Sequence, residues 1–236
     1  MTRIALVTGA NKGIGFAIAQ QLADAGVDVV IGARDEAAGR AAAARVPRAR
    51  FVQLDVSSAD SVRAAAESLT ALDVLVNNAG VSASGDGAGS TIADAALRQT
   101  FDVNFFGAVA VTQAMLPLLR RSPAGRIVMV SSSLARPALD TNLQLLGYRA
   151  SKAAVNMFTV ALARELAGTA IKVNAAAPGF TATDLNRHLA EAQPGWTPPP
   201  HTQTTEEAAR VPVRLALLPD DGPTGGFFDR TGAVAW

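Results

Sequence analysis

Short apolar runs alternate with longer segments of helical periodicity along most of the chain. The short runs are rich in Val, Ile and Leu and predict buried strands, whereas the longer segments repeat apolar residues three or four positions apart. Alternating strands and helices are typical of a parallel sheet with helices on both faces. The sequence therefore predicts an α/β fold, a doubly wound parallel sheet in a single domain over residues 1–236. The expected strands lie at 4–7, 28–31, 50–54, 72–76, 126–130, 171–175 and 225–228, and the expected helices at 16–25, 35–46, 58–69, 91–121, 148–166 and 206–218.

A glycine-rich turn joins the first expected strand to the first expected helix. Its glycines are spaced GxxxGxG, not the GxGxxG of the commonest dinucleotide fingerprint. Glycines let the backbone approach a pyrophosphate, and a helix N-terminus supplies N–H groups and a positive dipole. A purely structural turn is the alternative, but strand, turn, helix and second strand together fit one βαβ unit of the Rossmann type. The candidate cofactor-binding residues of the turn are Gly9, Asn11, Lys12, Gly13, Ile14 and Gly15.

The second expected strand, 28–31, is followed by Gly32, Ala33 and Arg34, where an acidic residue would bind the adenosine ribose 2′-OH and select NAD. The planar guanidinium of Arg34 can instead pair with a 2′-phosphate, and Lys12 can add a second cation. These residues predict NADP(H) as the cofactor. The alternative is that Arg34 caps a turn or pairs with Asp35 or Glu36.

Polar residues and glycines also follow the later strands, at the edge where open parallel sheets bind ligands. The sequence NNAG closes the fourth strand, although it can also be read as a simple turn. Three serines close the fifth strand, and their hydroxyls would face the same cleft as Tyr148. The further cofactor-binding candidates at these strand ends are Asp55, Val56, Asn77, Asn78, Ala79, Gly80, Pro178, Gly179, Thr181 and Thr183.

Tyr148 and Lys152 are four residues apart in an expected helix, so they project from one helix face. A cation beside a phenol favours the phenolate and lowers the tyrosine's pKa below its free value of about 10. That lowering suits a tyrosine that acts as general acid or base near neutral pH. Chance spacing explains YxxxK when it stands alone, but three other motifs occur in order around it.

Two further features near the expected site have alternative interpretations. Asn104 lies among apolar residues of the expected helix at 91–121, so it is either a satisfied core residue or a kink that brings the helix into the active site. The segment 184–205 contains Trp196, a run of three prolines and both histidines. We expect it to be a substrate lid, with an irregular excursion as the alternative.

Composition argues against several classes of function. The net charge of +1 gives no case for a nucleic-acid or anionic-membrane partner. The absence of cysteine removes disulfides, thiolate catalysis and Cys-ligated metals, and the two histidines are expected at the surface, so we expect no metal. No uninterrupted apolar run is long enough to span a bilayer, and no signal peptide precedes the first strand. A cytoplasmic location is therefore expected.

Taken together, these residues resemble the short-chain dehydrogenase/reductase family over nearly the whole chain. The first helix, the GARD turn and the tail LLPDDGPTGGFFDR are similar to the carbonyl-reductase branch of that family, which prefers NADPH. The matching pieces are TGANKGIG at 8–15, LDV at 54–56, NNAG at 77–80, Asn104, the serines at 131–133, YRASK at 148–152 and PGFTAT at 178–183.

The resemblance implies catalytic roles for four residues. Tyr148 would protonate the carbonyl oxygen in reduction, and Lys152 would lower the pKa of Tyr148 and bind the nicotinamide ribose. Ser132 would hydrogen-bond the substrate oxygen, and Asn104 would hold a relay water near Lys152. Because the loop before Tyr148 is longer than the commonest family spacing, Ser131 and Ser133 remain alternatives to Ser132.

The resemblance also implies cofactor contacts. Asp55 would meet the adenine, Asn77 and Gly80 would line the cofactor, and Pro178 and Thr183 would position the nicotinamide amide. In the family, the helix region around the site builds dimer and tetramer interfaces, so the resemblance implies a homodimer or homotetramer.

The sequence thus predicts an NADPH-dependent reductase that converts a ketone or aldehyde to an alcohol. One rival is a secondary-alcohol dehydrogenase that works oxidatively, because one site catalyses both directions. Another is a non-catalytic dinucleotide-binding regulator, which would need none of the proton chemistry. The partner is a small carbonyl or alcohol compound, whose identity would be read by the loops 81–90, 134–147 and 184–205.

Overall fold

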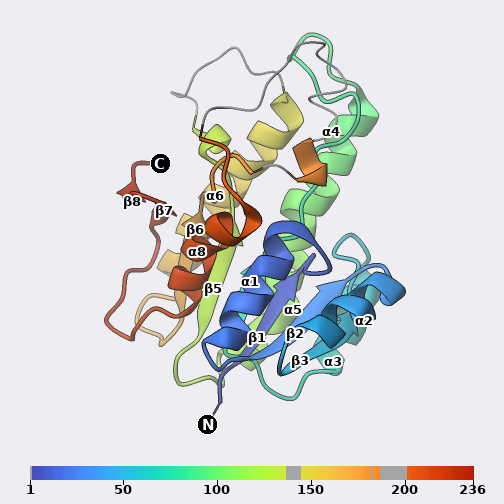
Figure 1. The fold of residues 1–236 in the computed structure, drawn as a ribbon. Helices are drawn as coiled ribbons and strands as arrows, with labels where there is room; N and C mark the ends of the chain where they lie inside the picture. The colour runs from blue at the N-terminus through green and yellow to red at the C-terminus, as the bar shows by residue number, and fades with distance from the viewer. Residues whose placement is uncertain (1, 137–144, 182, 187–200) are drawn as a thin grey trace.

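The computed structural model describes residues 2–136, 145–181, 183–186 and 201–236, and it contains one eight-stranded sheet with helices on both faces (Figure 1). The strand order is β3-β2-β1-β4-β5-β6-β7-β8. All neighbouring pairs are parallel except β7 and β8. The order reverses between β1 and β4, which confirms the predicted doubly wound Rossmann-type fold. The strands are β1 Ile4–Thr8, β2 Asp28–Ala33, β3 Ala49–Gln53, β4 Val74–Asn77, β5 Arg126–Val130, β6 Lys172–Ala176, β7 Phe227–Asp229 and β8 Gly232–Val234.

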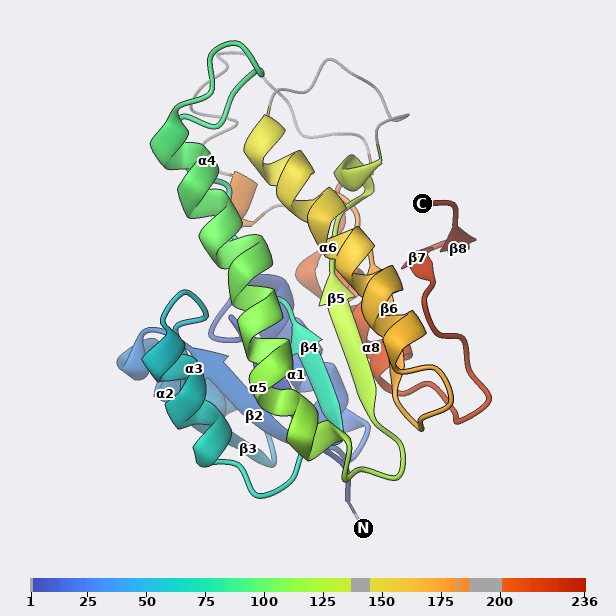
Figure 2. The ribbon, with the colours of Figure 1, turned by 180° about the vertical axis from the view of Figure 1, so that it is seen from behind.

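Helices cover both faces of the sheet. Helices α1 and α8 lie on the face seen in Figure 1, and α5 and α6 lie side by side on the opposite face seen in Figure 2. Successive residues of β1 serve the two faces in turn, because Leu6 packs into one buried cluster and Ala5 and Val7 into the other. The helices are α1 Gly13–Asp24, α2 Glu36–Arg45, α3 Ala59–Glu67, α4 Asp94–Phe101, η1 Asp102–Gly107, α5 Ala108–Leu119, η2 Ser133–Ala135, α6 Leu146–Glu165, η3 Asp184–Asn186 and α8 Thr205–Ala216.

The helix expected at 91–121 is not uniform. It begins at Asp94, and a π-helical segment, η1, separates α4 from α5. Gly107, at the end of η1, lies against Val56: a Cβ added there would be 2.8 Å from Val56 Cγ2 and 2.9 Å from Val56 O. The close approach of these two backbones therefore requires a glycine.

The combined helix Asp94–Leu119 has 26 residues and is apolar enough, by length and composition alone, to cross a membrane. In this fold it packs against the sheet, and Val111, Met115 and Leu119 are fully buried. These contacts are those of a core helix.

The sheet ends in a small hairpin that the sequence predicts only in part. The strand expected at 225–228 is β7, and the turn after it leads into the antiparallel strand β8, which was not expected. Trp236 stacks on the buried ring of Phe227 with 5.4 Å between ring centroids. This contact and β8 cover the edge of the sheet.

A buried arginine binds backbone carbonyl groups just before the N-terminal ends of β5 and β6. The side chain of Arg126, the first residue of β5, is fully buried. Its guanidinium donates to the carbonyl oxygens of Leu218, Gly125 and Ala170 and pairs with Asp220 at 2.8 Å. The charge is thus offset by three carbonyl dipoles and one carboxylate at the N-terminal edge of the sheet.

Candidate active site

The glycine turn and the NNAG segment are locked together at the C-terminal edge of β1 and β4. Gly9 has φ +64°, and a Cβ added to it would lie 2.9 Å from Ala79 Cα. The side-chain amide of Asn78 donates to the carbonyl oxygens of Thr8 (2.9 Å) and Gly9 (3.3 Å), and a Cβ on Gly15 would collide with that amide. Asn78 and Ala79 therefore shape the turn, and two of its glycines are sterically required.

Helix α1 begins at Gly13, three residues earlier than expected, so Gly13, Ile14 and Gly15 form its first turn. Lys12 precedes the helix and makes no side-chain cap. A Cβ added to Gly13 would meet only Thr183 Cγ2, at 3.9 Å. No side chain at Gly13 would therefore obstruct a pyrophosphate that binds at the N-terminus of α1.

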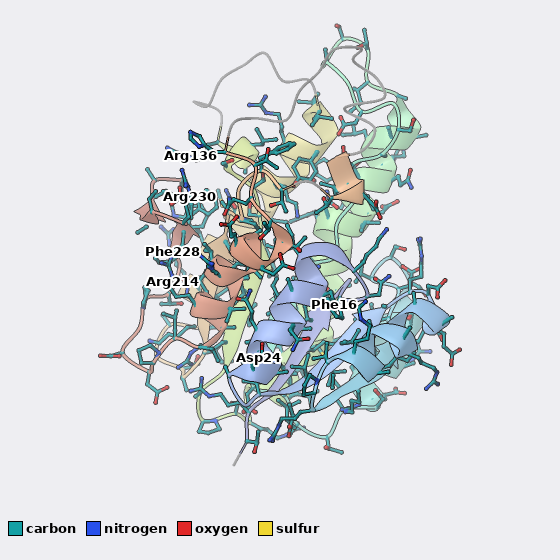
Figure 3. The ribbon with its side chains drawn as sticks, viewed as in Figure 1. Phe16, Asp24, Arg136, Arg214, Phe228 and Arg230 are labelled. Atoms are coloured by element: carbon teal, nitrogen blue, oxygen red, sulfur yellow. The ribbon has the colours of Figure 1, made fainter. Side chains whose placement is uncertain are left out.

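Arg34 is exposed directly after β2 and makes none of the ion pairs expected as alternatives. Asp35 instead caps α2 by accepting the N–H of Ala38 at 2.8 Å, and Glu36 pairs with Arg40 at 2.8 Å. The guanidinium of Arg34 is therefore available to a 2′-phosphate. Nearby, Phe16 projects from α1 towards α2, where the guanidinium of Arg45 lies 4.5 Å from its ring centroid (Figure 3).

Lys12 has a partner that the sequence does not suggest. Its ammonium pairs with Asp184 of η3 at 2.7 Å, with both side chains about half exposed. This ion pair joins the glycine turn to the segment that follows the PGFTAT motif. A 2′-phosphate would have to compete with Asp184 for Lys12.

Asp55 and Val56 follow β3 and serve different ends. Asp55 Oδ1 accepts hydrogen bonds from the backbone N–H (3.0 Å) and hydroxyl (2.6 Å) of Ser57. The hydroxyl bond chiefly lowers the pKa of Asp55, and the nearby charge of Arg34 lowers it further. The side chain of Val56 is buried against Gly107, so it belongs to the core.

Asn77 does not turn its side chain towards this group. The side chain is buried, and Nδ2 donates to Thr112 Oγ1 at 2.9 Å and to Met129 Sδ at 3.2 Å. Because neighbouring residues of a strand point to opposite sides, Asn77 faces α5 while Asn78 faces the glycine turn. The side chain of Asn77 thus ties β4 to α5, and the place of Asn77 along the cofactor stays a prediction.

Tyr148, Lys152 and Ser132 come together at the C-terminal end of β5. The hydroxyls of Tyr148 and Ser132 are hydrogen-bonded, and Lys152 Nζ lies 5.7 Å from the centroid of the Tyr148 ring. The Lys152 ammonium donates to the carbonyl oxygen of Val130 at 2.8 Å. Ser131, in contrast, is buried and donates to Asn156 Oδ1 at 2.6 Å. Among the three serines, Ser132 is therefore the one placed beside the phenol.

The pKa values of this pair follow burial. Burial raises the pKa of Tyr148, and the hydrogen bond with Ser132 offsets part of the rise. Burial also lowers the pKa of Lys152 to about 8. The expected lowering of the Tyr148 pKa by Lys152 is thus wrong for the protein by itself, because desolvation outweighs a cation that is directed at Val130.

Asn104 is a fully hydrogen-bonded residue within η1. Its side chain accepts from the N–H of Val81 at 2.8 Å and donates to Val81 O (2.9 Å) and Ser151 Oγ (3.0 Å). Both alternatives for this residue apply in part, since it is satisfied and lies in an irregular helical segment. A Cβ added to Gly80 would lie 3.3 Å from Asn104 Oδ1 and 3.5 Å from Lys152 Nζ. Asn104 and Lys152 therefore face the same small space over Gly80.

The segment after β6 lies next to the glycine turn. Gln203 donates its side-chain amide to Pro178 O at 2.7 Å, and its backbone pairs with Thr181. Thr181 also donates to Gly179 O at 3.3 Å. Of the expected lid at 184–205, Asp184–Asn186 and the residues from 201 on are described, whereas Trp196 and His188 lie outside the described residues, as does most of the loop 134–147.

A hollow of about 460 Å³ between α8 and the turn after β7 reaches this site only at Gln203, and it includes the described residues 201–203 of the expected lid. Arg214 and Arg230 lie on the same side of the molecule (Figure 3). None of the predicted site residues lines the hollow. The lining residues are His201, Thr202, Gln203, Glu207, Arg210, Val211, Arg214 and Arg230. Across the described part of the chain, no three His, Asp or Glu side chains are grouped so that they could hold a metal.

Residues 3–194 match the family model described as short chain dehydrogenase. The chain belongs to the short-chain dehydrogenase family. The predicted family and its enzyme class, a short-chain oxidoreductase, are confirmed. Tyr148, Lys152 and Ser132 all lie within the matched range.

Several named relatives of this short-chain dehydrogenase are reductases. The chain is 32% identical to (-)-isopiperitenone reductase of Mentha piperita, over 99% of this chain and 98% of the relative. It is 34% identical to carbonyl reductase [NADPH] 1 of Mus musculus, over 99% and 98%. The solved structure of an NADPH-bound carbonyl reductase from chicken fatty liver is 26% identical, with a TM-score of 0.85 over 100% of this chain and 99% of that chain. These neighbours agree with the predicted carbonyl-reductase branch.

Two contacts of the site were not predicted from the sequence. Asp86 binds the start of α6 at Tyr148, and Gln203 binds Pro178. The only sequence signal at Asp86 is an acidic residue between Gly85 and Gly87 in an otherwise small and polar loop. That signal does not identify a partner 62 residues further along the chain.

Proposed function

We propose that this short-chain dehydrogenase is an NADPH-dependent reductase of a ketone or aldehyde, with Tyr148 as the general acid. The observation that carries the proposal is the meeting of the Tyr148 phenol, the Ser132 hydroxyl and the Lys152 ammonium at the C-terminal end of β5, with Lys152 facing Gly80. Three proton donors at one sheet edge suit a substrate oxygen that gains negative charge as it is reduced.

The residues divide the work at the carbonyl group. Bound NADPH would supply the hydride for the carbonyl carbon. Ser132 orients the carbonyl oxygen by hydrogen bonding, and Tyr148 gives its phenolic proton to that oxygen. Because burial raises its pKa, Tyr148 holds this proton at neutral pH, which is the form that reduction requires. Lys152, with a pKa of about 8, stabilises the phenolate that remains and can return a proton to it.

The proposed NADPH preference depends on cations at the end of β2 and in the glycine turn. Arg34 lies where the 2′-phosphate would be read, and the two neighbouring carboxylates, Asp35 and Glu36, are bound to Ala38 and Arg40 instead. The mouse and chicken relatives are both named with NADPH. The first turn of α1 would hold the pyrophosphate, and we propose that the segment 184–205 covers the substrate.

The decisive experiment removes the proposed acid. Tyr148→Phe keeps the ring but loses the hydroxyl, so carbonyl reduction by NADPH should fall by about 10²–10⁴-fold, the usual range for general acid catalysis. NADPH binding, measured by the fluorescence of the bound cofactor, should stay unchanged.

Ser132→Ala should also lose most turnover, whereas Ser131→Ala serves as its control, because the Ser131 hydroxyl is bound to Asn156 away from the phenol. Undiminished reduction by Tyr148→Phe would remove the mechanism. Tight NADPH binding without turnover of any compound in a carbonyl panel would instead favour a dinucleotide-binding regulator.

A further inference from the structure

The catalytic helix α6 receives its N-terminal cap from a distant loop. Leu145, at the cap position, has a left-handed backbone (φ +65°) and offers no side-chain hydrogen bond. The N–H of Leu146 donates instead to Gly87 O at 3.0 Å. The next two N–H groups, of Gly147 and Tyr148, donate to Asp86 Oδ1 and Oδ2, each at 2.8 Å. One carboxylate thus satisfies two of the free N–H groups of the first turn.

We propose that Asp86 is a positioning residue for Tyr148, fixing the backbone of the proposed general acid so that its phenol meets Ser132 and the substrate oxygen. The inference rests on the proposed function. Asp86 acts on the reaction through Tyr148 and makes no contact of its own with the reacting atoms.

The loop that carries Asp86 is itself anchored. The N–H of Asp86 donates to Ala83 O at 3.1 Å, and Gly85 O accepts the N–H of Ala93, just before α4, at 3.2 Å. Gly85 has φ +89°, and a Cβ added there would contact Ala93 and Ala96. Since α4 packs along α6, the carboxylate is held by the same layer that holds the helix it caps.

The fit on the α6 side is equally close. A Cβ on Gly147 would lie 3.2 Å from Asp86 Oδ1 and 3.3 Å from Oδ2, so only glycine allows this close approach without displacing the carboxylate. Tyr148 is therefore fixed at two ends: its N–H is bound to the loop at 81–90, and its hydroxyl is bound to Ser132 after β5. A shift at the first end would move the phenol relative to Ser132.

An ordinary helix cap would behave differently. A cap far from the reacting groups contributes to stability alone, by satisfying free N–H groups of the first turn. Ser58 is such a cap in this chain, because its hydroxyl accepts the N–H of Ser61 at the start of α3 (3.3 Å), away from Tyr148. Ser58→Ala is thus the matched control for loss of a cap alone.

The experiment compares Asp86→Ala, Asp86→Asn and Ser58→Ala in the full chain. Misplacement of a catalytic group by about 1 Å costs on the order of 10²-fold, so kcat of Asp86→Ala should fall about 10–100-fold while KM for NADPH stays within about threefold. Asp86→Asn keeps one acceptor oxygen and should recover part of kcat. If Asp86→Ala kept wild-type kcat and lost only thermal stability, as Ser58→Ala should, the proposal would be overturned.

A second readout needs no substrate. Tyr148 is the only tyrosine of the chain, so the ultraviolet titration of tyrosinate reports this phenol alone. Loosening the first turn of α6 lets water reach the phenol, so its pKa should move down towards 10 in Asp86→Asn, with Lys152 and Ser132 in place in both proteins. An unchanged titration overturns the positioning role even if Asp86→Ala does not fold. A shifted titration in a protein that reduces no carbonyl compound refutes the proposed function and leaves the positioning role standing.

Discussion

Tyr148 lies in surroundings that keep its proton in place. The residue is largely removed from solvent, its hydroxyl is hydrogen-bonded to Ser132, and the ammonium of Lys152 donates to a backbone carbonyl. Desolvation therefore sets its pKa more than charge does. The spacing of Tyr148 and Lys152 predicted their proximity. It gives no information on how deeply the phenol is buried, and burial decides the direction of the pKa shift.

At the same scale, Arg34 should decide between the two nicotinamide cofactors. Loss of a hydrogen bond to a charged group costs about 1.5–3 kcal/mol, so Arg34→Ala should raise KM for NADPH about 10–100-fold and leave KM for NADH nearly unchanged. Arg40→Ala is the matched control, because Arg40 is a nearby exposed arginine of α2 that is already paired with Glu36 of that helix. Steady-state kinetics with both cofactors measures the ratio, and an unaltered ratio in Arg34→Ala contradicts the assignment.

Some individual contacts are beyond the reach of the sequence. The motif spacing selected Asn77 and Lys12 as cofactor contacts, yet one side chain faces α5 and the other is bound to Asp184. Strand alternation could have separated Asn77 from Asn78, once the exact end of β4 was known. The partner of Lys12 is 172 residues away and follows no periodic pattern.

Among the elements, the segment from α4 to α5 differs most from its prediction. Its apolar periodicity reads as one helix, and the sequence carries no sign of η1 except Gly107 and the polar Asn104. The π-helical turn is set by tertiary contacts, with Asn104 bound to Val81 and Ser151 on one side and Gly107 against Val56 on the other. Long periodic elements were predictable to within a few residues, whereas the three-residue strand β8 is too short for any pattern.

The sign of the stability change in Gly107→Ala tests the packing of this element. Replacing a glycine within an ordinary helix by alanine stabilises a protein by about 0.5–1 kcal/mol. Here the new Cβ would meet Val56 O at 2.9 Å, which only a backbone shift can relieve, so Gly107→Ala should destabilise the protein by about 1–3 kcal/mol. Urea unfolding measures the change, and a gain in stability would show that η1 can move freely away from β3.

For the whole molecule, the proposed chemistry conflicts with stability at Lys152. The lysine is buried, and its pKa falls from 10.5 to about 8, so the unfolded chain binds more protons than the folded one between these values. Stability should therefore rise with pH across that window, and below pH 8 the full cost applies, about 3 kcal/mol at 1.36 kcal/mol per pKa unit.

Lys152→Met should remove that cost together with turnover. After allowing about 1 kcal/mol for the lost bond to Val130, the variant should be about 2 kcal/mol more stable than the wild type at pH 7. The advantage should shrink near pH 9.5, where the wild-type lysine is mostly neutral when folded. Urea unfolding at the two pH values tests this, and a variant that is less stable at pH 7 would show that the ammonium is well solvated.

The guanidinium of Arg126 has a consequence for how this protein can change. It fastens two parallel strands and the connection after α8 at the rim farthest from the glycine turn. Anchoring and chemistry thus occupy opposite rims of one sheet. Substitutions selected for a new substrate should lie at the C-terminal edge of the sheet, near Tyr148. Substitutions selected for heat tolerance should lie at the N-terminal edge, near Arg126, and the two sets should interfere little with each other.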